Sequence, residues 1–122
     1  MTIGDILALV DELKPNQYSD EIKIMWISEL DFNIFETLIK THEDAAIEEF
    51  NGYTENDMST EVIAPEAHKD IYTYYLFAMI DFMNGETDRY QNSSIMFNGA
   101  KQRYYDEYNR THMPISKPLG VF

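Results

Sequence analysis

The chain has 122 residues, 44% of them hydrophobic and 14% aromatic, and a formal net charge of −13 at pH 7. This length fits one domain with a core, the composition excludes a disordered chain, and no apolar run approaches the roughly 20 residues that span a bilayer. The absence of cysteine excludes disulfides, thiolate metal sites and cysteine nucleophiles. We expect a cytosolic protein without a signal peptide, because the first residues carry no positive charge cluster.

The negative charge is concentrated in the first half of the chain. Residues 1–61 contain 15 acidic and 3 basic residues, whereas residues 62–122 contain 7 and 6. Tight binding to DNA or RNA usually rests on clustered Lys and Arg that displace counterions from phosphates. The composition therefore argues against a nucleic-acid-binding protein and favours a surface that repels a polyanion.

Two amphipathic helices are predicted in the first part of the chain. Thr2 and Asp5 form a weak capping-box pattern, and the apolar residues that follow predict a helix over about 3–14, which Pro15 ends. Ser19, followed by two acids, caps a second and longer helix. Its broad apolar face, which we expect to be buried with Trp26 as a core anchor, comprises Ile22, Ile24, Met25, Trp26, Ile27, Leu30, Ile34, Phe35, Leu38 and Ile39.

The stretch 71–108 is predicted to form an antiparallel helical hairpin. Its break is at Gly85, which suits the left-handed conformation that ends a helix, and the next helix starts near Thr87. Pro65 is placed in the first turn of the preceding helix. The apolar positions of the first arm, expected to be mostly buried, are Ile71, Tyr72, Tyr75, Leu76, Ala78, Met79, Phe82 and Met83. The fold class is therefore an all-α bundle of about four helices.

Two segments lack a helical pattern. We call residues 43–64 the middle segment. It is rich in acidic residues and contains two short stretches that could be extended, 48–53 and 60–64. The segment is therefore predicted to form either a loop that serves for interaction or a small β-hairpin. Residues 111–122 contain two prolines and a glycine and are predicted to form an extended tail on a single helical domain of residues 1–110. Both segments carry apolar residues without an evident core of their own.

A search for catalytic, metal-binding and nucleotide-binding patterns finds none with the required spacing. His42, His68 and His112 occur in no HExxH arrangement and follow no glutamate by three residues, which argues against zinc-protease and di-iron sites. The glycines are too scattered for a phosphate loop, and no serine lies in a GxSxG turn. The acids that follow His42 are interpreted as solvated surface. We therefore expect a protein that is not an enzyme and uses no cofactor or metal.

Several segments resemble a family of small proteins from tailed-phage and prophage structural modules, the head–tail connector or head-completion adaptor proteins. The similar segments are LVDELKPNQYSDEIKIMWISELD (9–31), FNGY (50–53), IDFMNGETDRYQNSSIMFNGA (80–100) and YYDEYNRTHMP (104–114). The resemblance implies a helical bundle whose copies form a ring beneath the portal, extend the DNA channel and dock the tail. It also implies a virion protein, assembled in the cytoplasm of a bacterial host, whose partners are its own copies, the portal protein and a tail-completion protein. DNA would pass without specific binding, and no membrane would be involved.

A closed ring needs two unlike patches that meet between neighbouring copies. The acidic first half and a basic edge on the fourth helix, formed by Arg89, Lys101, Arg103 and Arg110, offer such a pair. The candidate interaction residues are Phe50, Tyr53, Met58, Arg110, His112, Met113, Ile115, Leu119 and Phe122. The alternative function is a small acidic regulatory or inhibitor protein that mimics a nucleic acid and occupies the basic cleft of a partner.

Overall fold

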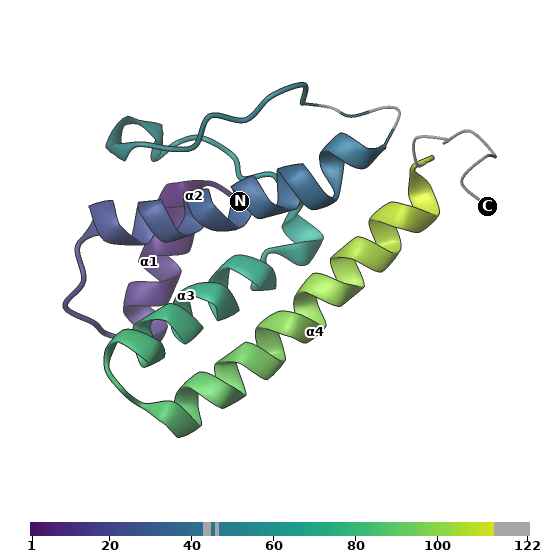
Figure 1. Ribbon diagram of the computed structural model, residues 1–122. Helices are drawn as coiled ribbons and strands as arrows, with labels where there is room; N and C mark the ends of the chain where they lie inside the picture. The colour runs from purple at the N-terminus through teal and green to yellow at the C-terminus, as the bar shows by residue number, and fades with distance from the viewer. Residues whose placement is uncertain (43–44, 46, 114–122) are drawn as a thin grey trace.

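The computed structural model describes residues 1–42, 45 and 47–113, which form an all-α bundle (Figure 1). The helices are α1 (Ile3–Leu13), α2 (Asp20–Thr37), α3 (Asp70–Met83) and α4 (Thr87–Thr111), with short 3-10 turns η1 (Ile39–Thr41), η2 (Glu55–Asp57) and η3 (Glu66–His68). Helix α3 packs against each of the other three helices and forms the predicted antiparallel hairpin with α4. Within the described ranges, no helix combines the length and the apolar character that a membrane span requires.

The predicted starts of α1 and α2 and the predicted break between α3 and α4 are confirmed. The hydroxyl of Thr2 accepts from the N–H of Asp5 at 3.1 Å, and the carboxylate of Asp5 accepts from the N–H of Thr2 at 3.1 Å. Ser19 caps α2 by accepting from the N–H of Ile22 at 3.2 Å. Gly85 has a φ of 73°, the left-handed conformation that lets the chain leave α3 and turn into α4. Local capping chemistry thus fixes these helix ends.

The core lies where α1, α2 and α3 meet, and it extends under the second half of α4. Trp26 is buried, as predicted for a core anchor, and the ring of Tyr18 packs against it edge-on at 5.6 Å. Four residues predicted to be buried are instead exposed: Ile22, Met25, Phe82 and Met83. Ile22 and Met25 lie on one face of α2. Phe82 and Met83 lie in the last turn of α3, where the ring of Tyr90 covers Phe82 only in part, with ring centroids 5.5 Å apart. The apolar stripe of each helix is therefore wider than its buried face.

The described residues of the middle segment follow an irregular path along α2 (Figure 1). These described residues contain no strand and hence no β-hairpin. The N–H groups of Ile3 and Gly4 donate to the carbonyls of Thr60 at 3.0 Å and Met58 at 2.8 Å. The first turn of a helix leaves such N–H groups without an internal partner. The segment therefore pairs with the start of α1 instead of with itself.

Two predicted boundaries shift. Pro65 precedes the turn η3, and α3 begins only at Asp70, so the proline does not lie in the first turn of the helix. Helix α4 continues to Thr111, and the N–H of His112 donates to the carbonyl of Tyr108 at 2.9 Å. The helical domain thus reaches past the predicted limit at residue 110. The part of the predicted tail from residue 114 onward lies outside the described residues.

Candidate functional site

The exposed side of α2 carries a row of large apolar side chains. Ile22, Met25 and Phe32 lie three and seven residues apart, which places them on one face of a helix. They are 38%, 50% and 40% exposed, respectively. Exposed apolar side chains gathered on one face mark a surface for interaction more often than isolated ones do. This row forms one wall of the candidate site.

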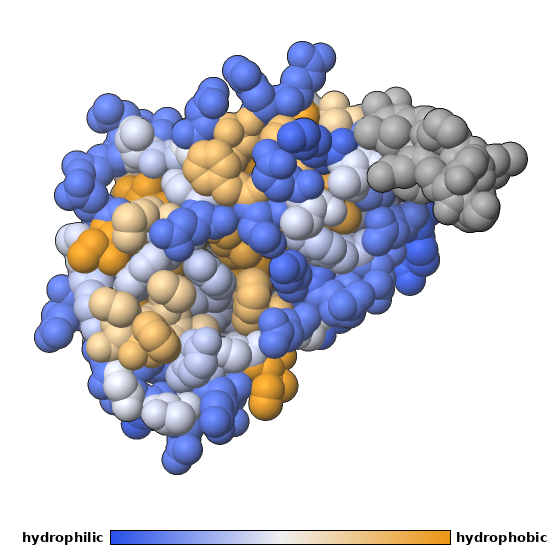
Figure 2. Space-filling view, viewed as in Figure 1, coloured by the Kyte–Doolittle hydropathy of each residue, from blue (hydrophilic) through white to orange (hydrophobic). Residues whose placement is uncertain are grey.

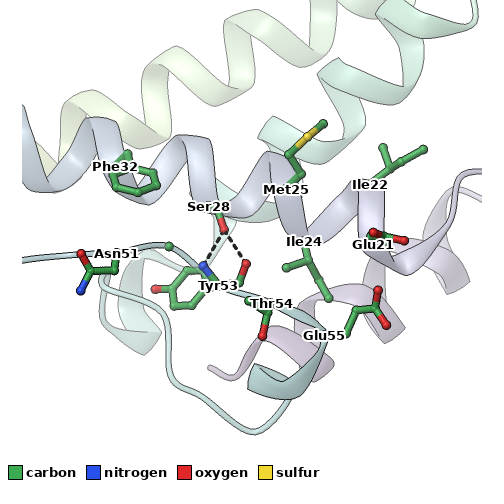
Figure 3. Close-up of a pocket in the computed structure, with 11 residues that line it drawn as sticks. Glu21, Ile22, Ile24, Met25, Ser28, Phe32, Asn51, Tyr53, Thr54 and Glu55 are labelled. Carbon is green, nitrogen blue, oxygen red and sulfur yellow. Dashed lines mark hydrogen bonds between the residues drawn. The ribbon is translucent and has the colours of Figure 1, made fainter.

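The middle segment forms the other wall. Residues 51–55 face α2 and enclose, with the apolar row, a pocket of about 480 Å³ (Figure 3). Gly52 has a φ of 88°, and a β-carbon at this position would lie 3.2 Å from the ring of Phe32. A larger residue would therefore be strained and would push the segment away from α2. We call this pocket the α2 groove.

Hydrogen bonds fix the wall of the α2 groove to α2. The N–H of Tyr53 donates to the hydroxyl of Ser28 at 2.8 Å, and its phenol donates to the carboxylate of Asp31 at 2.6 Å. Both partners project from α2 one turn apart, at the spacing that places them on one side of the helix. The groove is thus a built feature of the monomer rather than a gap beside a free loop.

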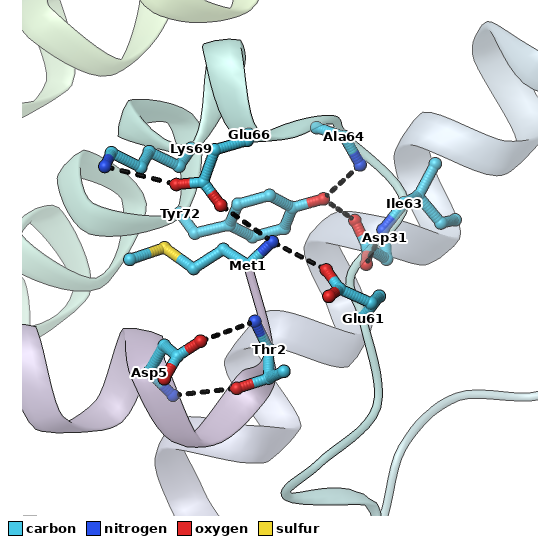
Figure 4. Close-up of polar contacts among 10 residues, drawn as sticks. All are labelled: Met1, Thr2, Asp5, Asp31, Glu61, Ile63, Ala64, Glu66, Lys69 and Tyr72. Carbon is cyan, nitrogen blue, oxygen red and sulfur yellow. Dashed lines mark hydrogen bonds and ion pairs between the residues drawn. The ribbon is translucent and has the colours of Figure 1, made fainter.

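Asp31 is the centre of this anchoring. Its carboxylate is fully buried and accepts from the hydroxyl of Tyr53 at 2.6 Å. It also accepts from the hydroxyl of Tyr72 at 2.6 Å and from the N–H of Ile63 at 3.2 Å (Figure 4). The Tyr72 hydroxyl in turn accepts from the N–H of Ala64 at 2.8 Å. Burial raises the pKa of Asp31, and the three donors oppose that rise. One carboxylate therefore joins α2, α3 and the middle segment.

The amino terminus adds a second tie to the same segment. In the structure, the ammonium group of Met1 lies 2.6 Å from the carboxylate of Glu61 and 3.2 Å from that of Glu66 (Figure 4). The hydrogen bond to Glu61 is the main reason that the pKa of this ammonium group is raised. Both carboxylates are well exposed, so these pairs hold the segment weakly compared with the buried Asp31 centre.

The rim of the α2 groove is acidic. Glu21 and Glu55 line it directly, and neither belongs to an ion pair among the described residues. A neighbouring hollow is lined by the same two glutamates together with Asp20 and Met58. On the face shown in Figure 2, apolar side chains gather between α2 and the middle segment, with hydrophilic side chains around them. The groove therefore suits an apolar group flanked by positive charge.

A second surface of opposite charge runs along α4. Arg89, Met96, Arg103 and Arg110 follow one another at seven-residue steps, and all are exposed. Seven residues fall about 20° short of two helical turns, so these side chains form one row, which we call the α4 stripe. The chain contains no other arginine. In the described residues Arg89 pairs with Glu86 at 3.0 Å, whereas Arg103 and Arg110 belong to no ion pair.

The structure divides the predicted interaction residues between two regions. Phe50 and Tyr53 pack at the α2 groove, their rings 5.0 Å apart, and Phe50 also meets Phe32 at 4.8 Å. Met58 lines the adjoining hollow. The apolar residues of this segment pack against the main core of the helical bundle, as Phe50 and Tyr53 do. The sequence did not identify Ile22, Met25 and Phe32 as candidate site residues. Helical spacing alone does not show which apolar residues of a helix are exposed.

The other predicted residues lie at the end of α4. Arg110 and Met113 are exposed, and the ring of His112 stacks on Tyr108 with centroids 3.8 Å apart. His112 also lines a smaller pocket of about 210 Å³, together with residues such as Ile39 and Ile63. Helix α4 thus presents its last turn beside a second, smaller hollow. Ile115, Leu119 and Phe122 lie outside the described residues.

The histidines serve as structural groups. His42 is buried, with Nδ1 2.6 Å from the carbonyl of Leu38 and Nε2 2.9 Å from the amide oxygen of Asn109. His68 pairs with Glu107. Both ring nitrogens of His42 are therefore engaged, and the described residues contain no cluster suited to a metal ion. Lys101 of the predicted basic edge likewise donates to Asn33 at 3.1 Å and so helps to hold α4 on α2.

The anchoring of the groove wall gives a first prediction. We expect Tyr53→Phe to lower the free energy of unfolding by about 1–2 kcal/mol, because it removes one donor from the buried Asp31 carboxylate. Urea unfolding measures the loss of stability. Hydrogen exchange at the backbone amide of position 53 should also become faster, because the middle segment is then held less firmly against α2. Tyr74→Phe removes the same atom from a tyrosine outside this network and should change neither. Equal losses in the two variants would contradict the role given to Asp31.

Comparison of the chain with models of protein families, with curated proteins and with solved structures found no match.

Proposed function

We propose that this chain is a structural, non-enzymatic head–tail connector of a tailed phage or prophage, which assembles as a ring between portal and tail. The observation that supports it best is that one monomer carries two exposed surfaces of unlike chemistry. The α2 groove is apolar with an acidic rim, whereas the α4 stripe is basic, with three arginines and one methionine. The resemblance of several sequence segments to the connector proteins supports the choice of this family. The two unlike surfaces would allow copies of the chain to bind one another and assemble.

The charge of the chain fits passage of DNA through such a ring. With a formal charge of −13, most surfaces of the assembled protein would repel phosphates and limit sticking during passage. The few exposed arginines lie in one row on α4, and a contact with a neighbouring copy would take them away from the channel. Burial of the α4 stripe between copies would therefore leave the channel surface more acidic than the surface of the isolated monomer.

The end of α4 is the candidate contact with the portal or the tail-completion protein. Arg110 and Met113 are exposed there, and the latter is 64% accessible. The sequence continues from this point with the apolar residues Ile115, Leu119 and Phe122. An apolar segment at the end of a folded domain suits capture by a groove on a partner.

Truncation after Met113 tests this function. We expect circular dichroism to show an intact helical domain, because α4 ends at Thr111 and His112 already packs on Tyr108. Binding to the candidate portal protein, followed by light scattering, should weaken at least tenfold relative to the full chain. Global unfolding of the truncated chain would show that the tail belongs to the core and would contradict this part of the proposal.

The same measurement separates the connector from the acidic inhibitor. A connector should form a large complex of many copies on the portal ring, whereas a nucleic-acid mimic should stay monomeric with the portal and bind a basic protein one to one. Light scattering of the full chain, alone and with the portal, therefore decides between an assembly protein and a regulator.

A further inference from the structure

We infer that the α2 groove of one copy receives the α4 stripe of a neighbouring copy. Met96 would enter the groove beside Ile22, Met25 and Phe32. One of the arginines that flank Met96 would meet Glu21 and Glu55, which lie together at the Ile22 end of the groove (Figure 3). The inference rests on the proposed function, for which it supplies the contact between subunits. The occupant of the groove is thus a second copy of this chain.

Charge complementarity is the first argument for this occupant. Two copies that each carry a formal charge of −13 repel one another unless their contact joins patches of opposite sign. The arginines of the chain all lie on the α4 stripe, and Glu21 and Glu55 stand on the groove rim outside any ion pair of the described residues. The α4 stripe is therefore the best-matched surface of a second copy for this rim.

The composition and length of the two surfaces also agree. Aromatic residues, methionine and arginine are enriched at protein interfaces, and these residue types make up much of both surfaces. Arg89 and Arg103 are 14 residues apart, which corresponds to about 21 Å along a helix, and the row from Ile22 to Phe32 covers about 15 Å. With Met96 over the middle of this row, an arginine reaches beyond each end. Methionine is unbranched and adapts to an irregular pocket.

The placement of the surfaces makes the contact head-to-tail. The α2 groove lies between α2 and the middle segment, whereas α4 packs mainly on α3 and contacts α2 through pairs such as Lys101 with Asn33 (Figure 1). A copy bound through its α4 stripe therefore keeps its own α2 groove open for another copy. Repetition of such a contact gives a ring when its rotation closes.

Cysteine cross-linking tests this contact in the full chain, which has no native cysteine. Met25→Cys marks the groove and Met96→Cys marks the stripe, and both positions are about half exposed, so the substitutions should leave the core intact. With a short bismaleimide at high protein concentration, we expect the double variant to give a ladder of covalent oligomers. A mixture of the two single variants should give dimers only, and each single variant alone should stay monomeric.

The controls make each outcome decisive. Leu13→Cys combined with Met96→Cys pairs the stripe with an exposed apolar residue outside the groove, and it should give no ladder. Self-cross-linking of either single variant would indicate a two-fold contact and overturn the inference, as would the absence of a 25–96 cross-link. If rings form on the portal without that cross-link, the inference fails while the proposed function stands. If the cross-link forms but the portal is not bound, the proposed function fails instead.

Charge reversal gives an independent measurement of the same contact. Arg89→Glu/Arg103→Glu should abolish the 25–96 cross-link, and Glu21→Arg/Glu55→Arg should do the same. Carrying both reversals in one chain should restore at least half of the cross-linked yield, because the opposite charges meet again. Loss of cross-linking without this rescue would show that charge pairing does not guide the contact and would overturn the inference.

Discussion

Replacing Lys14 by methionine should lower the free energy of unfolding by about 3–5 kcal/mol, because it leaves a buried carboxylate without its cation. The ammonium group of Lys14 lies 2.7 Å from Asp81, which is 1% exposed, and 5.3 Å from the centre of the Phe77 ring. The other oxygen of Asp81 accepts from the hydroxyl of Ser93 at 2.9 Å. This ion pair joins the end of α1 to α3 and α4, so its loss weakens three helices together.

Urea unfolding and thermal unfolding measure the effect, which corresponds to a fall in Tm of roughly 10 °C or more. Lys40→Met is the matched control, because Lys40 pairs with Glu36 at 3.2 Å on the exposed side of the chain, where such a pair contributes less than about 0.5 kcal/mol. The double variant Lys14→Met/Asp81→Asn should recover part of the loss, since no buried charge is then left unpaired. A double variant less stable than Lys14→Met would contradict this account.

The helices could be predicted because their signals are local. Thr2 with Asp5, Ser19 with its two acids, and Gly85 each act on backbone groups within a few residues, and each defines a helix end in the structure. Periodic apolar residues then identify the helices between these ends. Fold class and the α3–α4 hairpin follow from this information without any knowledge of long-range contacts.

Buried polar residues could not be predicted in the same way. Asp31 sits between Leu30 and Phe32 in α2, and an acid in such a pattern is ordinarily assigned to the solvent face. Its burial depends on Tyr53 and Tyr72, which are 22 and 41 residues away. The path of the middle segment depends on the same long-range hydrogen bonds. This explains why its sequence shows no regular spacing of apolar residues.

The candidate site was only partly predictable for a related reason. Phe50, Tyr53 and Met58 were identified because they lie in a segment without a helical pattern. Ile22, Met25 and Phe32 form the facing wall, yet their spacing resembles that of core residues. Whether an apolar helical residue is buried depends on which neighbour covers it, and here the middle segment covers only one side of the row.

Replacing Tyr72 by phenylalanine should lower the free energy of unfolding by roughly 2–6 kcal/mol, because its hydroxyl is hydrogen-bonded to two buried groups. It donates to Asp31 at 2.6 Å and accepts from the N–H of Ala64 at 2.8 Å, and each group left without its partner costs about 1–3 kcal/mol. Tyr74→Phe is the control on the same helix, since its hydroxyl takes no part in this network. Its stability should match that of the natural chain.

The pH dependence of this loss identifies the group responsible. Burial already raises the pKa of Asp31 in the folded chain, so the natural protein loses stability as pH rises from the unfolded value of the carboxyl, about 3.8, through the raised folded value. Without the Tyr72 donor the folded pKa rises further, and ionisation becomes more costly. The difference in unfolding free energy between variant and natural chain should therefore be smallest below pH 3.8, where the carboxyl is protonated in the folded and the unfolded chain, and should grow as pH rises through the folded pKa values. A difference that is constant with pH would assign the whole loss to Ala64 and the packing of the ring, and not to the buried carboxylate.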